Sequence, residues 1–217
     1  MIYRGASRDL RGEYVFVSAS IPDPSRWKGF YDPRQITDAV VSTSREVLAA
    51  NGRLVTAAHP TIAPMLLYVA SEFGSGATDD PPVVVFQSRL FEAVLPPETH
   101  RFEVEGTGRI EWVDAVEGET ADPGNRAASL ARMRRNMLDL TKPSAAIFVG
   151  GMDGISDEWS LVSELLPECR KYAFAGPGGE ARRYAGDSPS EIAPQLKILE
   201  LYPFLADLIV KDIVAAT

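Results

Sequence analysis

Six short runs of apolar, β-branched and aromatic residues alternate along the chain with segments whose apolar residues recur every three or four positions. Such runs are typical of strands buried on both faces, and such segments are typical of amphipathic helices. Strands that alternate with helices are joined by right-handed crossovers into a mainly parallel sheet. We therefore expect an α/β fold, a doubly wound and mainly parallel sheet flanked by helices, forming a single domain over residues 1–217. The expected strands are 13–21, 52–58, 81–90, 109–116, 144–151 and 171–176, and the expected helices are 33–50, 61–73, 123–141 and 156–166.

The segment 199–216 is apolar, but charged residues interrupt it at helical spacing. This pattern predicts an amphipathic helix that packs on the body of the protein or on a second subunit. Residues 202–216 and 130–138 are more apolar than a lone domain needs to expose, so we expect a homodimer or a larger assembly. No run approaches the roughly 18 uninterrupted apolar residues of a membrane span, and the amino terminus has no signal pattern. We therefore expect a cytoplasmic protein with no membrane partner.

The formal net charge of −8 at pH 7 argues against general binding to the phosphate backbone of nucleic acid. A small anionic ligand is still compatible with this charge, because backbone N–H groups can form a local positive site on an acidic protein. The single cysteine, Cys169, cannot form an internal disulfide, and the sequence offers no Cys/His cluster for a structural metal. We expect no metal and no required cofactor.

Small and polar residues follow four of the expected strands, at the edge where open parallel sheets bind ligands. Four such loops on one edge predict a crevice for a phosphate-bearing ligand. With Arg26 and Glu158, the predicted ligand-binding residues are Ser18, Ala19, Ser20, His59, Pro60, Thr61, Gly150, Gly151, Met152, Asp153, Gly154, Gly176, Gly178 and Gly179.

Each of these residues also has a purely structural interpretation. The hydroxyls of Ser18 and Ser20 either bind phosphate oxygens or satisfy turn backbone groups. Arg26 either contacts a phosphate or carboxylate or is a solvated loop charge. His59 either donates an N–H to a ligand at the positive end of the next helix or makes a local hydrogen bond.

The stretch 148–159 raises the same question for glycine. Gly150 and Gly151 either admit a phosphate to backbone N–H groups or only make a tight turn. Ser156 or Asp157 is expected to cap the helix that follows. Glu158 either faces the ligand, where it holds a ribose hydroxyl or acts on a sugar bond, or is favoured near the helix start by the dipole alone.

Four segments in this order, 15–22, 54–66, 145–159 and 172–181, resemble the SLOG superfamily. This Rossmann-like group unites the LOG nucleotide phosphoribohydrolases with DprA-like proteins. More narrowly, the chain looks like the sensor branches of prokaryotic conflict systems, including those fused to TIR or sirtuin domains. The resemblance implies a SLOG-type fold that binds a nucleotide-derived signal, of the NAD or ADP-ribose type. It also implies a role in antiviral defence or signalling, with occupancy passed to a separate effector protein.

The LOG enzymes carry the motif P-G-G-x-G-T-x-x-E, whose glutamate serves cleavage of an N-glycosidic bond. Gly151, Gly154 and Glu158 align with this motif, whereas Val149 replaces its proline, Ile155 replaces its threonine, and Met152-Asp153 is one residue longer than its single x. A partner arginine would come from the preceding helix, where Arg132, Arg134 and Arg135 are candidates. The alternative function is therefore a phosphoribohydrolase acting on nucleoside monophosphates, with Glu158 as its catalytic residue. The departures from the motif favour binding without catalysis.

Overall fold

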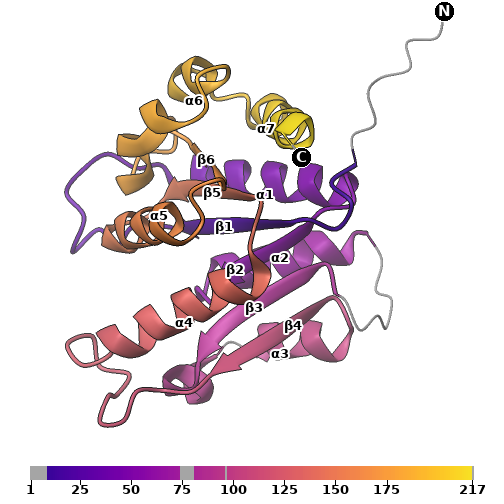
Figure 1. Cartoon of the computed structure of the whole chain (residues 1–217). Coiled ribbons are helices and arrows are strands. Elements are labelled where there is room, and N and C mark those ends of the chain that lie inside the picture. Colours follow the sequence, from indigo (N-terminus) through magenta and orange to yellow (C-terminus); the bar gives the residue numbers. More distant parts are fainter. Residues whose placement is uncertain (1–8, 74–80, 96, 217) are drawn as a thin grey trace, which may run out of the picture.

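The computed structural model describes residues 9–73, 81–95 and 97–216, so residues 1–8, 74–80, 96 and 217 of the predicted domain lie outside it. Its sheet has six strands in the order β4-β3-β2-β1-β5-β6, and every neighbouring pair is parallel. This architecture is the predicted doubly wound α/β fold (Figure 1). The strands are β1 (Tyr14–Ser20), β2 (Arg53–Ala57), β3 (Val83–Ser88), β4 (Gly108–Val113), β5 (Ala145–Gly150) and β6 (Arg170–Ala173).

The strand order reverses beside β1, because the chain builds outward from β1 to β4 and then returns to place β5 on the other side of β1. The register of this junction pairs Ser18 with Phe148 and Ser20 with Gly150. The crevice beyond such a reversal is the usual ligand position in open parallel sheets. The carboxyl ends of β1 and β5 therefore define where a site is expected.

Helices cover both faces of the sheet, as alternate residues of the strands require. The α-helices are α1 (Pro33–Ala49), α2 (Ile62–Ser71), α3 (Pro97–Val104), α4 (Ala127–Thr141), α5 (Asp153–Leu165), α6 (Ala193–Ile198) and α7 (Tyr202–Ala216), and the 3₁₀ segments are η1 (Arg89–Val94) and η2 (Glu180–Asp187). On β1, Val15 and Val17 pack against the layer of α1, α2 and α7, whereas Phe16 packs against the layer of α4 and α5.

The expected helix over 156–166 begins three residues earlier than predicted, at Asp153. The proposed caps were wrong, because α5 has Met152 at its N-cap and no side-chain capping bond there. The Ser156 hydroxyl instead donates to Glu180 Oε1 at 2.6 Å and accepts from Tyr184 at 2.8 Å. The early start places Glu158 in the second turn of the helix rather than at its first.

The carboxyl-terminal helix α7 packs on α1 within the same chain. It buries Tyr202, Leu205 and Ile209, and Asp212 accepts hydrogen bonds from Arg170 and Tyr172 of β6. On α4, Met133, Met137 and Leu138 are buried, whereas Leu140 is 71% exposed. Most of the apolar residues that suggested an assembly surface therefore pack within the chain.

None of the helices in the described part of the chain is both long and apolar enough to span a membrane.

Candidate functional site

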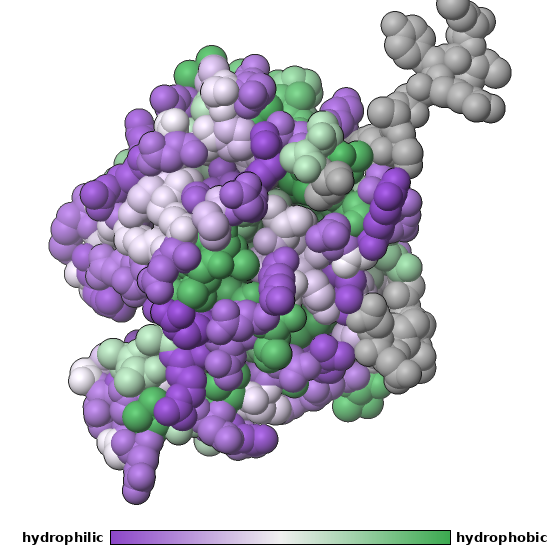
Figure 2. Space-filling model, in the orientation of Figure 1, coloured by the Kyte–Doolittle hydropathy of each residue, from purple (hydrophilic) through white to green (hydrophobic). Residues whose placement is uncertain are grey.

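A cavity of about 770 Å³ opens at the carboxyl ends of the strands. Residues at the carboxyl ends of β1, β2 and β3 form its floor, and residues of η1, α4 and α5 form its walls. In the space-filling view the surface is indented at the left edge, between the regions of α5 and α4 (Figure 2). The volume of the cavity lies in the range of roughly 300–1,000 Å³ that is typical of small-molecule sites.

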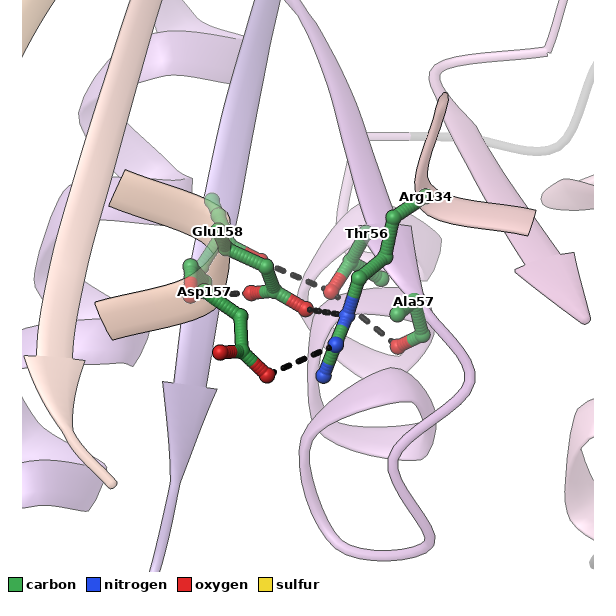
Figure 3. Close-up of polar contacts among 7 residues, drawn as sticks. Thr56, Ala57, Arg134, Asp157 and Glu158 are labelled. Atoms are coloured by element: carbon green, nitrogen blue, oxygen red, sulfur yellow. Dashed lines mark hydrogen bonds and ion pairs between the residues drawn. The ribbon is translucent and has the colours of Figure 1, made fainter. Parts of the chain in front are cut away.

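The most polar part of the cavity is a cluster of Ser18, Arg134, Asp157 and Glu158, called the Glu158 cluster below. Arg134 Nε donates to Glu158 Oε1 at 2.9 Å, and Arg134 Nη1 lies 3.2 Å from Asp157 Oδ2. The Ser18 hydroxyl donates to Glu158 Oε2. Figure 3 shows Arg134 approaching the two acids from the opposite wall. Both oxygens of the Glu158 carboxylate are thus held by donors from different elements.

Three elements, β1, α4 and α5, bring the residues of the Glu158 cluster together. Ser18 lies on the same face of β1 as Phe16, toward α4 and α5, because side chains alternate along a strand. Thr56 supports this strand end by donating its hydroxyl to the Val17 carbonyl at 2.8 Å. The Glu158 side chain is buried, with the residue only 8% exposed. Because an unpaired buried carboxylate costs several kcal/mol, Arg134 and Ser18 make its burial possible.

The phase of α4 decides which arginine enters the cavity. Glu119 fixes the helix start, since its carboxylate accepts the N–H groups of Ala128 and Ser129 at 2.8 and 2.6 Å. Arg126, Leu130 and Arg134, each four residues apart, then share the face that lines the cavity. Arg132 turns instead to the Asp114 and Ala115 carbonyls, and Arg135 pairs with Glu164. Of the three candidate arginines, Arg134 is the one that meets Glu158.

Ten of the predicted ligand-binding residues line this cavity. They come from the loops after β1, β2 and β5, so those loops converge as the sequence indicated. They are Ser18, Ala19, Ser20, Arg26, His59, Pro60, Met152, Asp153, Gly154 and Glu158. The lining does not include Thr61, Gly150, Gly151, Gly176, Gly178 or Gly179.

The glycines after β5 and β6 are buried in contact between two turns. Gly151 N donates to the Ser20 carbonyl at 2.7 Å, and the Gly151 carbonyl accepts from Glu180 N at 2.9 Å. A Cβ built on Gly179 would lie 2.4 Å from the carbonyl carbon of Gly150, and both residues have positive φ. Close contact between backbones explains these glycines. The backbone that contacts Gly150 is the glycine turn after β6 of the same chain.

His59 lies on the cavity wall just before α2. Its Nδ1 accepts the Thr61 N–H at 3.3 Å, which assigns the proton of the neutral ring to Nε2. Burial lowers the pKa of His59. A neutral imidazole with Nε2–H is a hydrogen-bond donor of the kind the sequence suggested for this residue.

Sequence reasoning missed the residues of the opposite wall. Phe91, Val94 and Leu95 follow β3, and Arg126 and Leu130 lie on α4. Residues 89–109 showed no clear period, so nothing in the sequence indicated that η1 would reach the cavity. Gln87 also lines it, and its place at the end of a strand is the signal that would have identified it.

No group of three or more His, Cys, Asp or Glu side chains suited to a metal ion occurs among the described residues. Cys169 is buried away from the cavity lining, and burial raises the pKa of its thiol to about 12. A thiol with so high a pKa is a poor nucleophile near neutral pH.

Comparison with protein families gives one match. The model of the family described as the SLOG cluster3 family matches residues 27–202, which is more than half of the chain. A search of curated proteins found no match. The matched range contains α4, α5 and Glu158. It begins directly after Arg26, so Ser18 and Arg26 lie outside it. Membership of such a family suggests binding or processing of a nucleotide-related ligand.

Proposed function

The chain belongs to the SLOG cluster3 family, and from this premise we propose that it binds a nucleotide-derived ligand of the NAD or ADP-ribose type and signals its occupancy. The observation that carries the proposal is the cavity beyond β1 and β5, with the Glu158 cluster in its wall. Carboxylate oxygens accept hydrogen bonds from ribose hydroxyls, and an arginine beside them donates to ring or hydroxyl oxygens. The cluster therefore fits a sugar.

The anionic part of such a ligand belongs elsewhere in the cavity. Asp157 and Glu158 both pair with the one Arg134 guanidinium, and Asp153 lines the same part of the cavity, so this excess of acids disfavours a phosphate there. Arg26 and the Nε2–H of His59 lie on other parts of the lining. We assign the phosphates to these two residues and to Ser20.

The signalling part of the proposal rests on the resemblance to sensor branches of prokaryotic defence systems. We propose that ligand binding to this chain is signalled to a separate effector protein, and that the chain acts as a homodimer or larger assembly.

Titration calorimetry with ADP-ribose, NAD and AMP tests binding, together with native mass spectrometry for a retained nucleotide. The designed pair is Ala127→Trp and Ala128→Trp. Both alanines are exposed on the first turn of α4, but only Ala127 lines the cavity. We expect Ala127→Trp to abolish binding and Ala128→Trp to retain it, with similar melting temperatures. A wild type that binds none of the three ligands, or an Ala127→Trp variant that binds normally, contradicts the proposal.

A phosphoribohydrolase is the second candidate, and one observation favours it. The buried Arg134–Glu158 pair provides the partner arginine that the alternative function requires. In such a reaction the Glu158 carboxylate would stabilise the positive charge that develops on the sugar as the N-glycosidic bond breaks.

Chromatography of AMP incubations separates the two candidates by detecting free base. We expect no base release by the wild type, and we expect Glu158→Gln to keep much of the ligand affinity. Glu164→Gln is the matched control, since Glu164 also joins α5 to α4 by an ion pair, with an exposed arginine. Base release that is present in wild type and Glu164→Gln but absent in Glu158→Gln would establish the hydrolase instead.

A further inference from the structure

The cavity has a second end that the Glu158 cluster does not use. Phe91, Val94 and Leu95 of the segment after β3 line it, and Leu130 of α4 lies between this end and Arg134 on the same helix. Val94 is 67% exposed, and Phe91 is only partly buried. This apolar end therefore has surface that a ligand would cover.

The strand order places the apolar end at a distance from the Glu158 cluster. The segment with Phe91 follows β3, which is three strands from β5 in the sheet, and α5 follows β5. Neighbouring strands lie about 4.8 Å apart, so the two ends are separated by roughly 14 Å at the strand ends. An elongated ligand with chemically different halves fits this arrangement.

The charges of the two ends differ as well. Among the described residues of the lining, the carboxylates are Asp153, Asp157 and Glu158, and all three belong to α5. The apolar end has instead the Arg126 guanidinium, which lies 5.7 Å from the centroid of the Phe91 ring. Aromatic faces and guanidinium planes both stack on flat heterocycles, with no need for a charge on the ligand.

Gln87 gives this end a directional group. It lines the cavity at the carboxyl end of β3, and its Oε1 accepts the Ser88 N–H at 2.9 Å. This bond assigns the side-chain orientation, so that Nε2 is the atom left to donate hydrogen bonds elsewhere. Nitrogen and oxygen acceptors on the edge of a nucleobase are suitable partners.

We infer that Phe91, Arg126, Leu130 and Gln87 form the subsite for the planar base of the nucleotide ligand. Phe91 and Arg126 provide the stacking surface, and Gln87 donates to an acceptor on the base edge. This inference rests on the proposed function. For a ligand of the ADP-ribose type it places the adenine and its own ribose at η1 and the terminal ribose at the Glu158 cluster, so that AMP occupies the η1 end alone.

The test compares AMP with ribose 5-phosphate, which has the sugar and the phosphate but no base. Wild type is expected to bind AMP at least tenfold more tightly, because stacking of one base contributes about a factor of ten or more. Phe91→Ala should weaken AMP binding about tenfold or more and leave ribose 5-phosphate unchanged. Phe91→Trp should bind AMP at least as well as wild type. Phe204→Ala is the control, since Phe204 is an exposed ring on α7 outside the cavity lining.

Each remaining outcome overturns the inference in a recognisable way. Equal affinity of wild type for AMP and ribose 5-phosphate shows that the base makes no contribution. A Phe91→Ala variant that binds AMP normally, or that loses both ligands equally, removes Phe91 from a base subsite. If Phe91→Ala is unfolded by circular dichroism, the Phe91→Trp result and the wild-type comparison still decide. A wild type that binds no nucleotide at all contradicts the proposed function itself.

Discussion

Arg134 is the side chain that joins the two helices on either side of the cavity. Its side chain is only 18% exposed, and it satisfies a Glu158 side chain that is 11% exposed. Its neighbour Arg135 makes a similar link between α4 and α5 to Glu164, but with side chains that are 48% and 65% exposed. The two pairs share their helices and differ in burial, so they form a matched comparison of the energy of a buried and an exposed ion pair.

We predict that Arg134→Met lowers the free energy of unfolding by about 2–3 kcal/mol, because it leaves a buried carboxylate with Ser18 as its remaining donor. Arg135→Met should change it by less than about 1 kcal/mol, since exposed pairs contribute little. Urea denaturation of both variants measures the difference. Equal losses in the two variants would show that Glu158 is better solvated than its burial indicates.

His59 makes the free energy of unfolding depend on pH. Burial lowers the pKa of His59 below its ordinary value of about 6.5. As the pH falls through that ordinary value, the unfolded chain takes up a proton that the folded chain does not, so the folded state loses stability. Stability that is present above about pH 6.5 is therefore lost progressively below it, down to the lowered pKa.

We predict that His59→Gln reduces the loss of stability between about pH 7.5 and about pH 5.5, because it removes the group whose pKa differs between the folded and unfolded chain. Unfolding by urea at several pH values measures the slope for each protein. A slope unchanged by His59→Gln would mean that this imidazole takes up its proton equally well when folded.

Among single residues, the sequence predicted Glu158 and the loops around it, and it limited the partner of Glu158 to three arginines without choosing among them. Ser18 lies near the carboxyl end of β1 and His59 follows β2, so their position at the ligand-binding edge is a consequence of strand boundaries. The choice among Arg132, Arg134 and Arg135 depends on the rotation of α4, which Glu119 sets from outside the helix. A contact between separate elements of this kind leaves no local pattern in the sequence.

At the scale of elements, the glycine turn after β5 allows two reasons for a glycine to be compared, namely steric crowding and a left-handed backbone. A Cβ on Gly151 would lie 2.3 Å from Ile155 Cγ1, and its φ is +69°. Gly118 has a φ of +81° with no atom within 4 Å of a built Cβ, and Gly124 has neither restriction. The three positions separate the cost of crowding from the cost of the left-handed backbone.

We predict that Gly124→Ala is nearly neutral and that Gly118→Ala costs about 1 kcal/mol through its backbone alone. Gly151→Ala should cost about 2 kcal/mol or more, because steric overlap adds to the same backbone strain. Denaturant titrations of the three variants give these values. Should Gly151→Ala be no worse than Gly118→Ala, the turn has room to relax, and crowding against Ile155 does not explain this glycine.

The alternation of strands and helices was predictable because each element is periodic over several residues. All six expected strands and the helices α1, α2 and α4 occur where the pattern placed them, to within a few residues. The start of α5 was misplaced because Ser156 resembles a cap in sequence, whereas its hydroxyl is used by Glu180 in another loop. The segments η1 and η2 are too short to show a period, and η1 carries part of the cavity wall.

For the whole molecule, one sheet with a core on each face predicts a single unfolding transition. The two cores share the same strands, since alternate residues of β1 belong to each. We expect calorimetry to give one cooperative transition, which would support the single domain predicted from the sequence. Ligand at a hundred times its dissociation constant should raise the free energy of unfolding by about 2.7 kcal/mol without splitting that transition. Two separable transitions would instead divide the chain between the halves of the sheet.

The homodimer predicted from the sequence stays a prediction, although α7 and α4 bury their main apolar faces within the chain. Light scattering at micromolar concentration measures the molar mass in solution.

The Ser18–Glu158 hydrogen bond joins residues that are 140 positions apart in the chain. Contacts of such long range form slowly, because a large loop must close before they can stabilise anything. During synthesis, β1 and α4 leave the ribosome before α5 does. A nascent chain therefore holds an unfinished half-site until α5 has emerged, and competence to bind depends on that last step.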